Sequence, residues 1–315
     1  MNLVYFGSGH FGLDCLNAII KTKHNLRFIV TQPAQLAGRG RKPTPTPVAA
    51  WAIENSIEYI ETQNVNSQES VSKILQYKPD LIVVIAFGQK VSNQVISIAP
   101  KAAINVHASL LPKYRGAAPI NWAIIKGETK TGISIITLAD KMDAGDILAY
   151  AETDIGQNET AEQLHDRLAS LAAPVLCETI DKIADGSAIY TKQDHSKATL
   201  APKLKKSDGH LDFSESAQSL KNKILGLWPW PGASALYATR KTAQKQRVTF
   251  ATAEVANASK SLPHGTLDEN LNIVCGQDAL KILKLQPAGS SLMDFQDFVN
   301  GRQTMPGDSF KKIDT

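Results

Sequence analysis

The sequence has few of the residues that cross-link a chain, bind a structural metal or anchor a protein in a membrane. Its three cysteines are far apart and form no Cys-x-x-Cys pair, which argues against a disulfide framework and a cysteine zinc site. The histidines lack metal-ligand spacing, so we expect no metal. The longest apolar run, Leu81–Phe87, is far shorter than the roughly twenty residues of a membrane helix. We therefore expect a cytoplasmic protein with reduced thiols and no membrane attachment.

The sequence does have an ordinary globular composition, on a chain too long for a single core. Hydrophobic residues make up 43% and charged residues 20% of the 315 residues, which excludes disordered and collagen-like classes and favours two domains. Residues 1–200 hold 19 Lys and Arg and 19 Asp and Glu, so residues 201–315 hold the other 15 of 34 basic and 11 of 30 acidic residues. This basic excess fits an anionic partner such as nucleic acid, and it fits a solvated basic face equally well.

Strand and helix patterns alternate through the first half of the chain. Leu3–Phe6 and Leu26–Val30 are short apolar strands, and Leu81–Phe87 suits a strand buried on both faces of a parallel sheet. Helical patterns lie between them, which predicts an α/β domain with a parallel sheet. Residues 190–206 are polar with little periodicity, and short alternating segments follow them. We predict a linker there and a small antiparallel sheet or barrel beyond it.

Asn105 and His107 are the strongest candidates for chemistry. Strand alternation places both on one face at the C-terminal end of a strand, where open parallel sheets bind their ligands. An amide donor beside an imidazole suits an acyl centre, because the amide stabilises an oxyanion while the histidine handles a proton. Asp143, in a loop after the next strand, is placed to hold the tautomer of His107. Taken singly, the Asn-x-His pair also fits a structural role, and the aspartate fits a turn cap before glycine.

Two further motifs have two interpretations each. Gly7-Ser-Gly9-His-Phe-Gly12 has dinucleotide-binding spacing, but no acidic residue ends the second strand, so tight packing of the first turn is the preferred interpretation. The loop after the second strand is unusually long and carries Arg39, Arg41 and Lys42 among glycines and prolines. These cations suit phosphate contacts, and a disordered surface loop is the alternative.

The run Ser109-Leu-Leu-Pro-Lys-Tyr-Arg-Gly-Ala-Ala-Pro-Ile-Asn-Trp resembles the folate-dependent formyltransferases. Five shorter matches extend the resemblance over the whole chain: Thr31-Gln-Pro with Ala37-Gly-Arg-Gly, Ile104-Asn-Val-His, Asp143-Ala-Gly-Asp, Trp228-Pro-Trp-Pro and Leu285-Gln-Pro-Ala-Gly. The resemblance implies a Rossmann-like parallel-sheet formyltransferase domain over residues 1–189, a linker over 190–206 and a small oligonucleotide-binding-type (OB-like) β-barrel over 207–315. The chain departs from the family at Gly7-Ser8-Gly9, where Gly-Thr-Pro is usual.

The same resemblance implies an activity and assigns roles to residues. It implies transfer of the formyl group of 10-formyltetrahydrofolate to the α-amine of methionyl initiator tRNA, without a metal, and we expect a monomer. Asn105, His107 and Asp143 match the catalytic positions of the family. The folate-contacting stretch of the family matches Ser109, Leu110, Leu111 and Pro112. The tRNA-contacting loop of the family matches Arg39, Arg41 and Lys42.

Three alternatives explain part of the sequence. A formyltransferase for a small amine, such as an amino-sugar nucleotide, would share Asn105, His107 and Asp143 but needs neither a basic loop nor a basic last third. A non-catalytic RNA-binding module explains the charge but not the Asn-x-His pair at a ligand-binding strand end. A nucleotide-linked oxidoreductase rests on the glycine motif alone. The tRNA-directed formyltransferase is therefore the favoured hypothesis.

Overall fold

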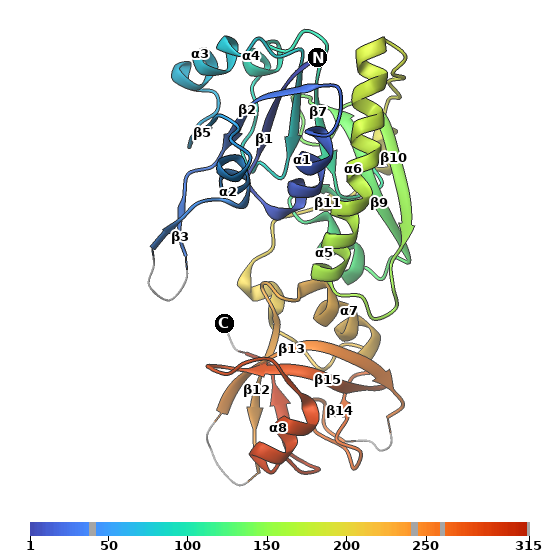
Figure 1. Cartoon of the computed structure of the whole chain (residues 1–315). Helices are drawn as coiled ribbons and strands as arrows, with labels where there is room; N and C mark the ends of the chain where they lie inside the picture. Colours follow the sequence, from blue (N-terminus) through green and yellow to red (C-terminus); the bar gives the residue numbers. More distant parts are fainter. Residues whose placement is uncertain (38–41, 241–244, 259–261, 314–315) are drawn as a thin grey trace. The chain divides into compact units, whose positions relative to one another are not determined.

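The computed structural model describes residues 1–37, 42–240, 245–258 and 262–313, which fold into two compact units (Figure 1). The first unit comprises Met1–Gly116, Gly132–Thr153 and His165–Leu200, and the second comprises Ala117–Thr131, Asp154–Leu164 and Ala201–Thr315. Each unit thus combines segments from several parts of the sequence.

A sheet with the strand order β10-β9-β7-β6-β1-β2-β5 forms the centre of the first unit. Strands β1, β2, β5, β6 and β7 run parallel, which confirms the α/β prediction. Strand β9 pairs antiparallel with β7, so the sheet is mixed at this end. The strands are β1 (Asn2–Gly7), β2 (Asn25–Thr31), β5 (Tyr59–Glu61), β6 (Leu81–Ile85), β7 (Ala102–His107), β9 (Lys130–Thr137) and β10 (Ile147–Asp154).

Alternate side chains of β1 enter packing layers on opposite faces of the sheet. Val4 and Phe6 are fully buried in a cluster that includes side chains of α3 and α4. Tyr5 points the other way and lies against Gly12, directly before α1. Helices therefore cover both faces (Figure 1), as the buried strands of a parallel sheet require. The helices of this layer structure are α1 (Leu13–Ile19), α2 (Pro47–Glu54), α3 (Gln68–Gln76), α4 (Asn93–Ile96) and α6 (Ala161–Asp185).

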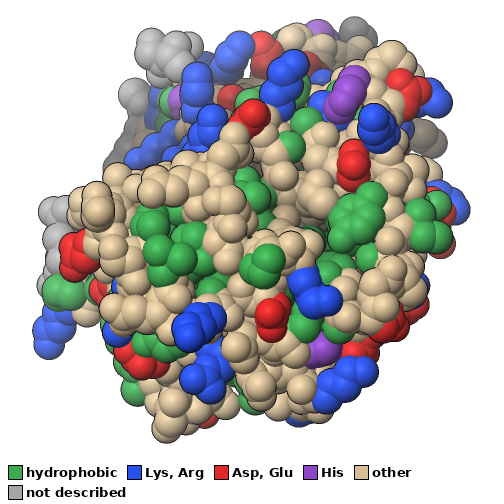
Figure 2. Space-filling view, turned by 90° about the horizontal axis from the view of Figure 1, so that it is seen from above, with side chains coloured by type: hydrophobic (Ala, Val, Ile, Leu, Met, Phe, Trp, Pro, Cys, Tyr) green, Lys and Arg blue, Asp and Glu red, His purple; other side chains and the backbone are tan. Residues whose placement is uncertain are grey.

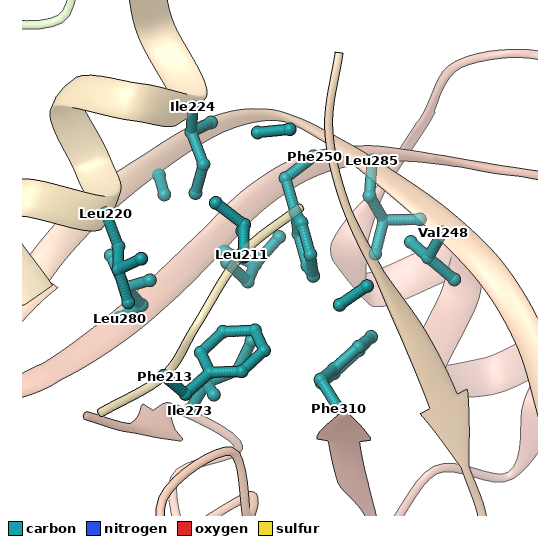
Figure 3. Packing of buried hydrophobic residues seen from close by; sticks show 14 of the residues in the cluster. Leu211, Phe213, Leu220, Ile224, Val248, Phe250, Ile273, Leu280, Leu285 and Phe310 are labelled. Carbon is teal, nitrogen blue, oxygen red and sulfur yellow. The ribbon is translucent and has the colours of Figure 1, made fainter. Parts of the chain in front are cut away.

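The second unit contains a nearly closed antiparallel β-barrel, which confirms the predicted small barrel. Its strand order is β14-β15-β13-β12-β17, and β16 pairs with β15. Phe213, Phe250 and Phe310 meet in its core (Figure 3), where the Phe250 ring centroid lies 6.5 Å from that of Phe213 and 5.2 Å from that of Phe310. The elements are α5 (Pro119–Ile125), α7 (Ala217–Leu227), β12 (Ala233–Ala238), β13 (Lys245–Ala256), β14 (Ile273–Val274), β15 (Ala279–Pro287), β16 (Met293–Asp294), α8 (Phe295–Arg302) and β17 (Ser309–Lys311).

A close helix contact explains why α5 packs within the second unit although it lies between β7 and β9 in the sequence. A Cβ atom at Gly226 of α7 would lie 2.9 Å from Asn121 O and 2.7 Å from Ile125 Cγ1. Asn121 Nδ2 donates a hydrogen bond to Gly226 O at 2.7 Å. The missing side chain at Gly226 lets the two helices approach, so tertiary packing places α5 in this unit.

The surface at the top of Figure 1, next to α3 and α4, carries charges of both signs. Figure 2 shows Lys and Arg side chains there, interspersed with acidic and apolar ones. This face therefore does not favour a partner of one charge sign.

Within the described ranges, every helix is too short or too polar to cross a membrane.

Candidate active site

Asn105 and His107 lie where the sequence predicts them, at the C-terminal end of β7 with one residue between them. In the antiparallel neighbour β9, Ser134 stands opposite His107 and Ile136 opposite Asn105. His107 is only 6% exposed, whereas Asn105 is half-buried. The side-chain amide of Asn105 makes no hydrogen bond to the part of the chain that the structure describes. Its donor is therefore available to a ligand.

Asp143 faces the His107 ring, so the structure brings together the three predicted catalytic residues. Asp143 Oδ2 lies 3.6 Å from His107 Nδ1 and accepts a hydrogen bond from Gly116 N at 2.8 Å. On the other side of the ring, His107 Nε2 lies 2.9 Å from Tyr114 O. A carbonyl oxygen can only accept, so Nε2 carries the proton of this bond. Both ring nitrogens therefore face oxygen atoms that can accept a hydrogen bond.

The two residues that contact the His107 ring have strained backbones. Tyr114 has φ 61° and Asp143 has φ 53°, in the left-handed region that non-glycine residues rarely adopt. Such a conformation costs on the order of 1–3 kcal/mol and persists where surrounding contacts hold it, often at functional sites. The Asp143 turn therefore depends on the contacts that hold it.

Gly145 is required by the same turn. A Cβ atom at this position would overlap Thr137 O and would lie 2.6 Å from Thr137 Oγ1. Asp146 N donates a hydrogen bond to Thr137 Oγ1 at 2.9 Å, which also holds the turn against Thr137. The glycine of the Asp143-Ala-Gly-Asp motif therefore allows the turn to lie close against the end of β9.

The predicted folate-contacting stretch follows β7 directly and is held by one side chain of β9. Ser134 Oγ accepts from Leu111 N at 3.1 Å and donates to Ser109 O at 2.7 Å. Ser109 and Leu111 are buried, whereas Leu110 and Pro112 are partly exposed. Of the four residues, these last two are therefore the ones with exposed surface. Sequence reasoning missed Ser134, although a serine between isoleucines in a buried strand was an available signal.

The glycine motif of the first turn packs against Tyr5. A Cβ atom at Gly12 would overlap the Tyr5 hydroxyl, and one at Gly7 would lie 2.6 Å from both Tyr5 Oη and Ile85 O. Ser8 Oγ accepts from Gln32 N at 3.0 Å and so ties the turn to the end of β2. These contacts account for Gly7 and Gly12 without a dinucleotide, as the packing interpretation expects, whereas a Cβ atom at Gly9 would meet only Ala86 Cβ at 3.8 Å.

The long basic loop contains a short hairpin. Strands β3 (Gln35–Ala37) and β4 (Lys42–Thr44) pair antiparallel where the sequence predicts a loop. Lys42 is exposed on β4. Arg39 and Arg41 lie outside the described residues. Of the three predicted tRNA-contacting cations, the structure thus places Lys42 alone, on an element separate from the Asp143 turn.

The cysteines are poorly suited to nucleophilic chemistry. All three are unpaired, and burial raises the pKa of Cys275 to about 12 and the pKa of the Cys15 thiol further. Burial also raises the pKa of Cys177, with a smaller effect from Asp181. These thiols stay protonated at neutral pH, and the thiolate is the reactive form. Among the described residues, no group of three His, Cys, Asp or Glu side chains is placed to hold a metal ion.

Comparison with known proteins identifies the class of protein. Residues 1–180 match the formyl transferase family, and residues 203–303 match the formyl transferase C-terminal domain. The chain belongs to the formyl transferase family, which confirms the resemblance found in the sequence.

Particular relatives are similar over nearly the whole length. The methionyl-tRNA formyltransferase of Geobacter metallireducens is 38% identical over 309 residues, which cover 98% of this chain and 97% of that protein. A methionyl-tRNA formyltransferase structure from Clostridium thermocellum has a TM-score of 0.54 at 16% identity, covering 81% of this chain and 93% of that one. HypX from Aquifex aeolicus, in complex with tetrahydrofolic acid, has a TM-score of 0.63 at 17% identity, covering 100% of this chain and 50% of HypX. The two structural likenesses concern the fold.

Proposed function

We propose that this chain transfers the formyl group of 10-formyltetrahydrofolate to the α-amino group of methionyl initiator tRNA. One arrangement carries the proposal: the Asn105 amide, without a partner in the described chain, lies beside the His107 ring that Asp143 faces. An amide donor and an imidazole at a strand end suit acyl transfer. The likeness to a methionyl-tRNA formyltransferase over 98% of the chain supports this acceptor over a small amine.

The proposed reaction is a direct transfer. The neutral α-amine attacks the formyl carbon, which forms the new C–N bond and leaves a tetrahedral oxyanion. The Asn105 side chain donates a hydrogen bond to this oxyanion. The bond between the formyl carbon and N10 then breaks as the carbonyl re-forms. The proton lost by the amine passes to N10 of the departing tetrahydrofolate, so the reaction needs no further reactant.

His107 and Asp143 act together in this scheme. The protonated ring places positive charge beside the oxyanion, while Asp143 orients the ring and assists proton transfer between the amine and N10. For the ring to donate to the oxyanion, Nε2 must exchange its bond to Tyr114 O for one to the substrate. Its charge acts on the oxyanion in either arrangement.

We further propose which segments bind each substrate. The stretch Ser109, Leu110, Leu111 and Pro112 contacts the folate, with Leu110 and Pro112 presenting their side chains because they are the partly exposed members. Arg39, Arg41 and Lys42 contact tRNA phosphates, since cations flanked by glycine and proline suit the nucleic-acid backbone.

We propose a separate function for each of three consecutive segments of the chain. Residues 1–189 catalyse the transfer, residues 207–315 bind tRNA and residues 190–206 connect them. The three unpaired cysteines support action in a reducing compartment, the cytoplasm. We propose a monomer, which sedimentation of the purified chain tests.

The direct test is a panel of acceptors. The purified chain is incubated with 10-formyltetrahydrofolate and one of three acceptors: methionyl initiator tRNA, uncharged tRNA or an amino-sugar nucleotide. The products are identified by mass spectrometry. We expect formyl on the methionine of the charged tRNA alone. Formylation of the sugar amine instead would overturn the proposed acceptor, and folate binding without any product would overturn the proposed activity.

A further inference from the structure

Gln193 lies in the segment predicted to be a linker, yet its side chain is buried in the first unit. The residue is 6% exposed. Its Nε2 donates to Asp143 O at 2.9 Å and to Gly145 O at 2.8 Å. Its Oε1 accepts from Arg115 Nη2 at 2.5 Å and from Arg115 Nε at 3.2 Å. A side-chain amide has two donor hydrogens and two acceptor lone pairs, so both ends of Gln193 are fully engaged.

These bonds form a closed ring with the carboxylate of Asp143. Gly116 N donates to Asp143 Oδ2 at 2.8 Å, and Gly116 directly follows Arg115, whose side chain binds Gln193. Gln193 in turn binds the main chain of Asp143. Asp143 is therefore held at both its carbonyl and its carboxylate. The same carboxylate oxygen lies 3.6 Å from His107 Nδ1. The hydrogen bonds that hold Asp143 therefore also fix its distance from His107.

Gln193 also accounts for the persistence of a strained backbone. Asp143 has φ 53°, and a left-handed non-glycine residue needs contacts that hold it. Both Gln193 donor bonds go to carbonyls of this turn, one at Asp143 and one at Gly145. Without them, the turn would be free to relax toward a common conformation and carry the carboxylate away from His107.

Residues near Gln193 hold the loop on the other side of the His107 ring. Tyr114 N donates to Thr199 Oγ1 at 2.8 Å, and Arg115 N donates to Thr199 O at 2.9 Å. Thr191 and Ile147 exchange two backbone hydrogen bonds of 2.8 and 2.9 Å. The segment 191–199 thus contacts both turns whose residues touch His107.

We propose that Gln193 is a positioning residue that holds the Asp143 turn in the geometry needed for formyl transfer. The proposal rests on the proposed function for the reaction, whereas the contact between Asp143 and His107 does not depend on the acceptor. Gln193 acts on the reacting atoms through Asp143 and touches no substrate itself. A side chain that shifts a catalytic group by about 1 Å typically changes the rate on the order of a hundredfold.

Two variants separate the bonds of Gln193. Gln193→Leu removes all of them at similar volume. Gln193→Glu keeps an acceptor for Arg115 but cannot donate to Asp143 O or Gly145 O. We expect both variants to lower kcat about tenfold to a hundredfold, with the KM for folate and for tRNA changed less than about threefold. A kcat within about twofold of wild type in both variants would overturn the proposal.

A double-mutant cycle tests whether Gln193 acts through Asp143. In an Asp143→Asn background, Gln193→Leu should lower kcat less than about twofold further, because residues that act as a unit are non-additive. The same fold loss of kcat in both backgrounds would show that Gln193 acts independently of Asp143 and would refute the positioning role.

The matched control is Asn66→Ala, which removes an amide bonded to Lys90 O and Ser92 N, each at 2.8 Å. We expect its kcat to stay within about twofold of wild type.

A second readout does not need turnover. The chemical shifts of the His107 ring protons are compared by NMR at a single neutral pH in wild type, Gln193→Leu and Asp143→Asn. We expect Gln193→Leu to move these chemical shifts in the same direction as Asp143→Asn, since both disturb the carboxylate that faces Nδ1. Unchanged chemical shifts in a folded Gln193 variant would overturn the proposal. A wild type that formylates no methionyl-tRNA would instead contradict the proposed function, and this comparison would still decide the role of Gln193.

Discussion

At the residue scale, the candidate site depends on groups that single substitutions remove. Asn105→Ala deletes an amide that bonds to no described residue, so the variant should fold normally and lose about a hundredfold or more in kcat. His107→Ala should lose a similar factor, because it removes the ring that Asp143 and Tyr114 contact. Steady-state kinetics and thermal unfolding of each variant check this. Turnover within about tenfold of wild type would contradict the assigned role.

Gly145 offers a second test at this scale. Gly145→Ala places a Cβ atom on Thr137 O, so we expect a loss of about 1–3 kcal/mol in the free energy of unfolding, together with lower kcat as the turn moves. Gly301→Ala is the matched control, because a Cβ atom at this helical position meets nothing within 4 Å. It should stabilise the chain by up to about 1 kcal/mol. Urea unfolding measures both, and a Gly145→Ala variant as stable and active as wild type would show that the motif glycine is dispensable.

At the element scale, the sequence predicted what local chemistry decides and missed what distant contacts decide. The apolar run Leu81–Phe87 contains the fully buried strand β6, as predicted, because a short unbroken apolar run by itself suits the interior of a parallel sheet. Gln193 was hidden in a polar, aperiodic stretch, since its partners Asp143 and Gly145 lie 50 and 48 residues away. The proposed catalytic residues were predictable from a family motif, whereas the contacts that hold the Asp143 turn were not.

The basic loop after β2 gives a testable prediction about tRNA binding at this scale. Arg39→Ala should raise the KM for tRNA on the order of tenfold and leave the Kd for folate unchanged, because a phosphate contact acts on the nucleic acid alone. The dependence of kcat/KM on salt should also weaken by about one counterion. Arg27→Ala, at an exposed position in β2, is the control for a general loss of charge. An equal loss of folate and tRNA affinity in Arg39→Ala would refute the tRNA role of the loop.

At the scale of the whole molecule, stability in acid depends on carboxylates that are bonded in the folded state. Asp212 accepts from Lys312 Nζ at 2.7 Å and from Ser214 Oγ and N, and these bonds, Lys312 first, hold its pKa well below 3.8. A pKa depressed by folding contributes stability above the ordinary value and loses it as pH falls through the folded one.

Asp212→Asn should therefore lower the free energy of unfolding at neutral pH by about 1 kcal/mol or less, since the pair is partly exposed. The difference from wild type should shrink as the pH falls below 3.8. Urea unfolding of both chains from neutral pH to about pH 3 measures it. A difference that persists unchanged or grows in acid would rule out this role for the charged pair.

The two compact units serve one proposed reaction, direct formyl transfer to methionyl-tRNA at the end of β7. The most direct measurement is a single turnover with the chain in excess over 10-formyltetrahydrofolate labelled in its formyl carbon, with methionyl initiator tRNA present. Asn105→Ala is run in parallel. The account predicts that the label moves to the methionine amine at the rate at which tetrahydrofolate forms, and that the variant slows both together. Label found on the protein or released as formate, with the methionine unmodified, would contradict it.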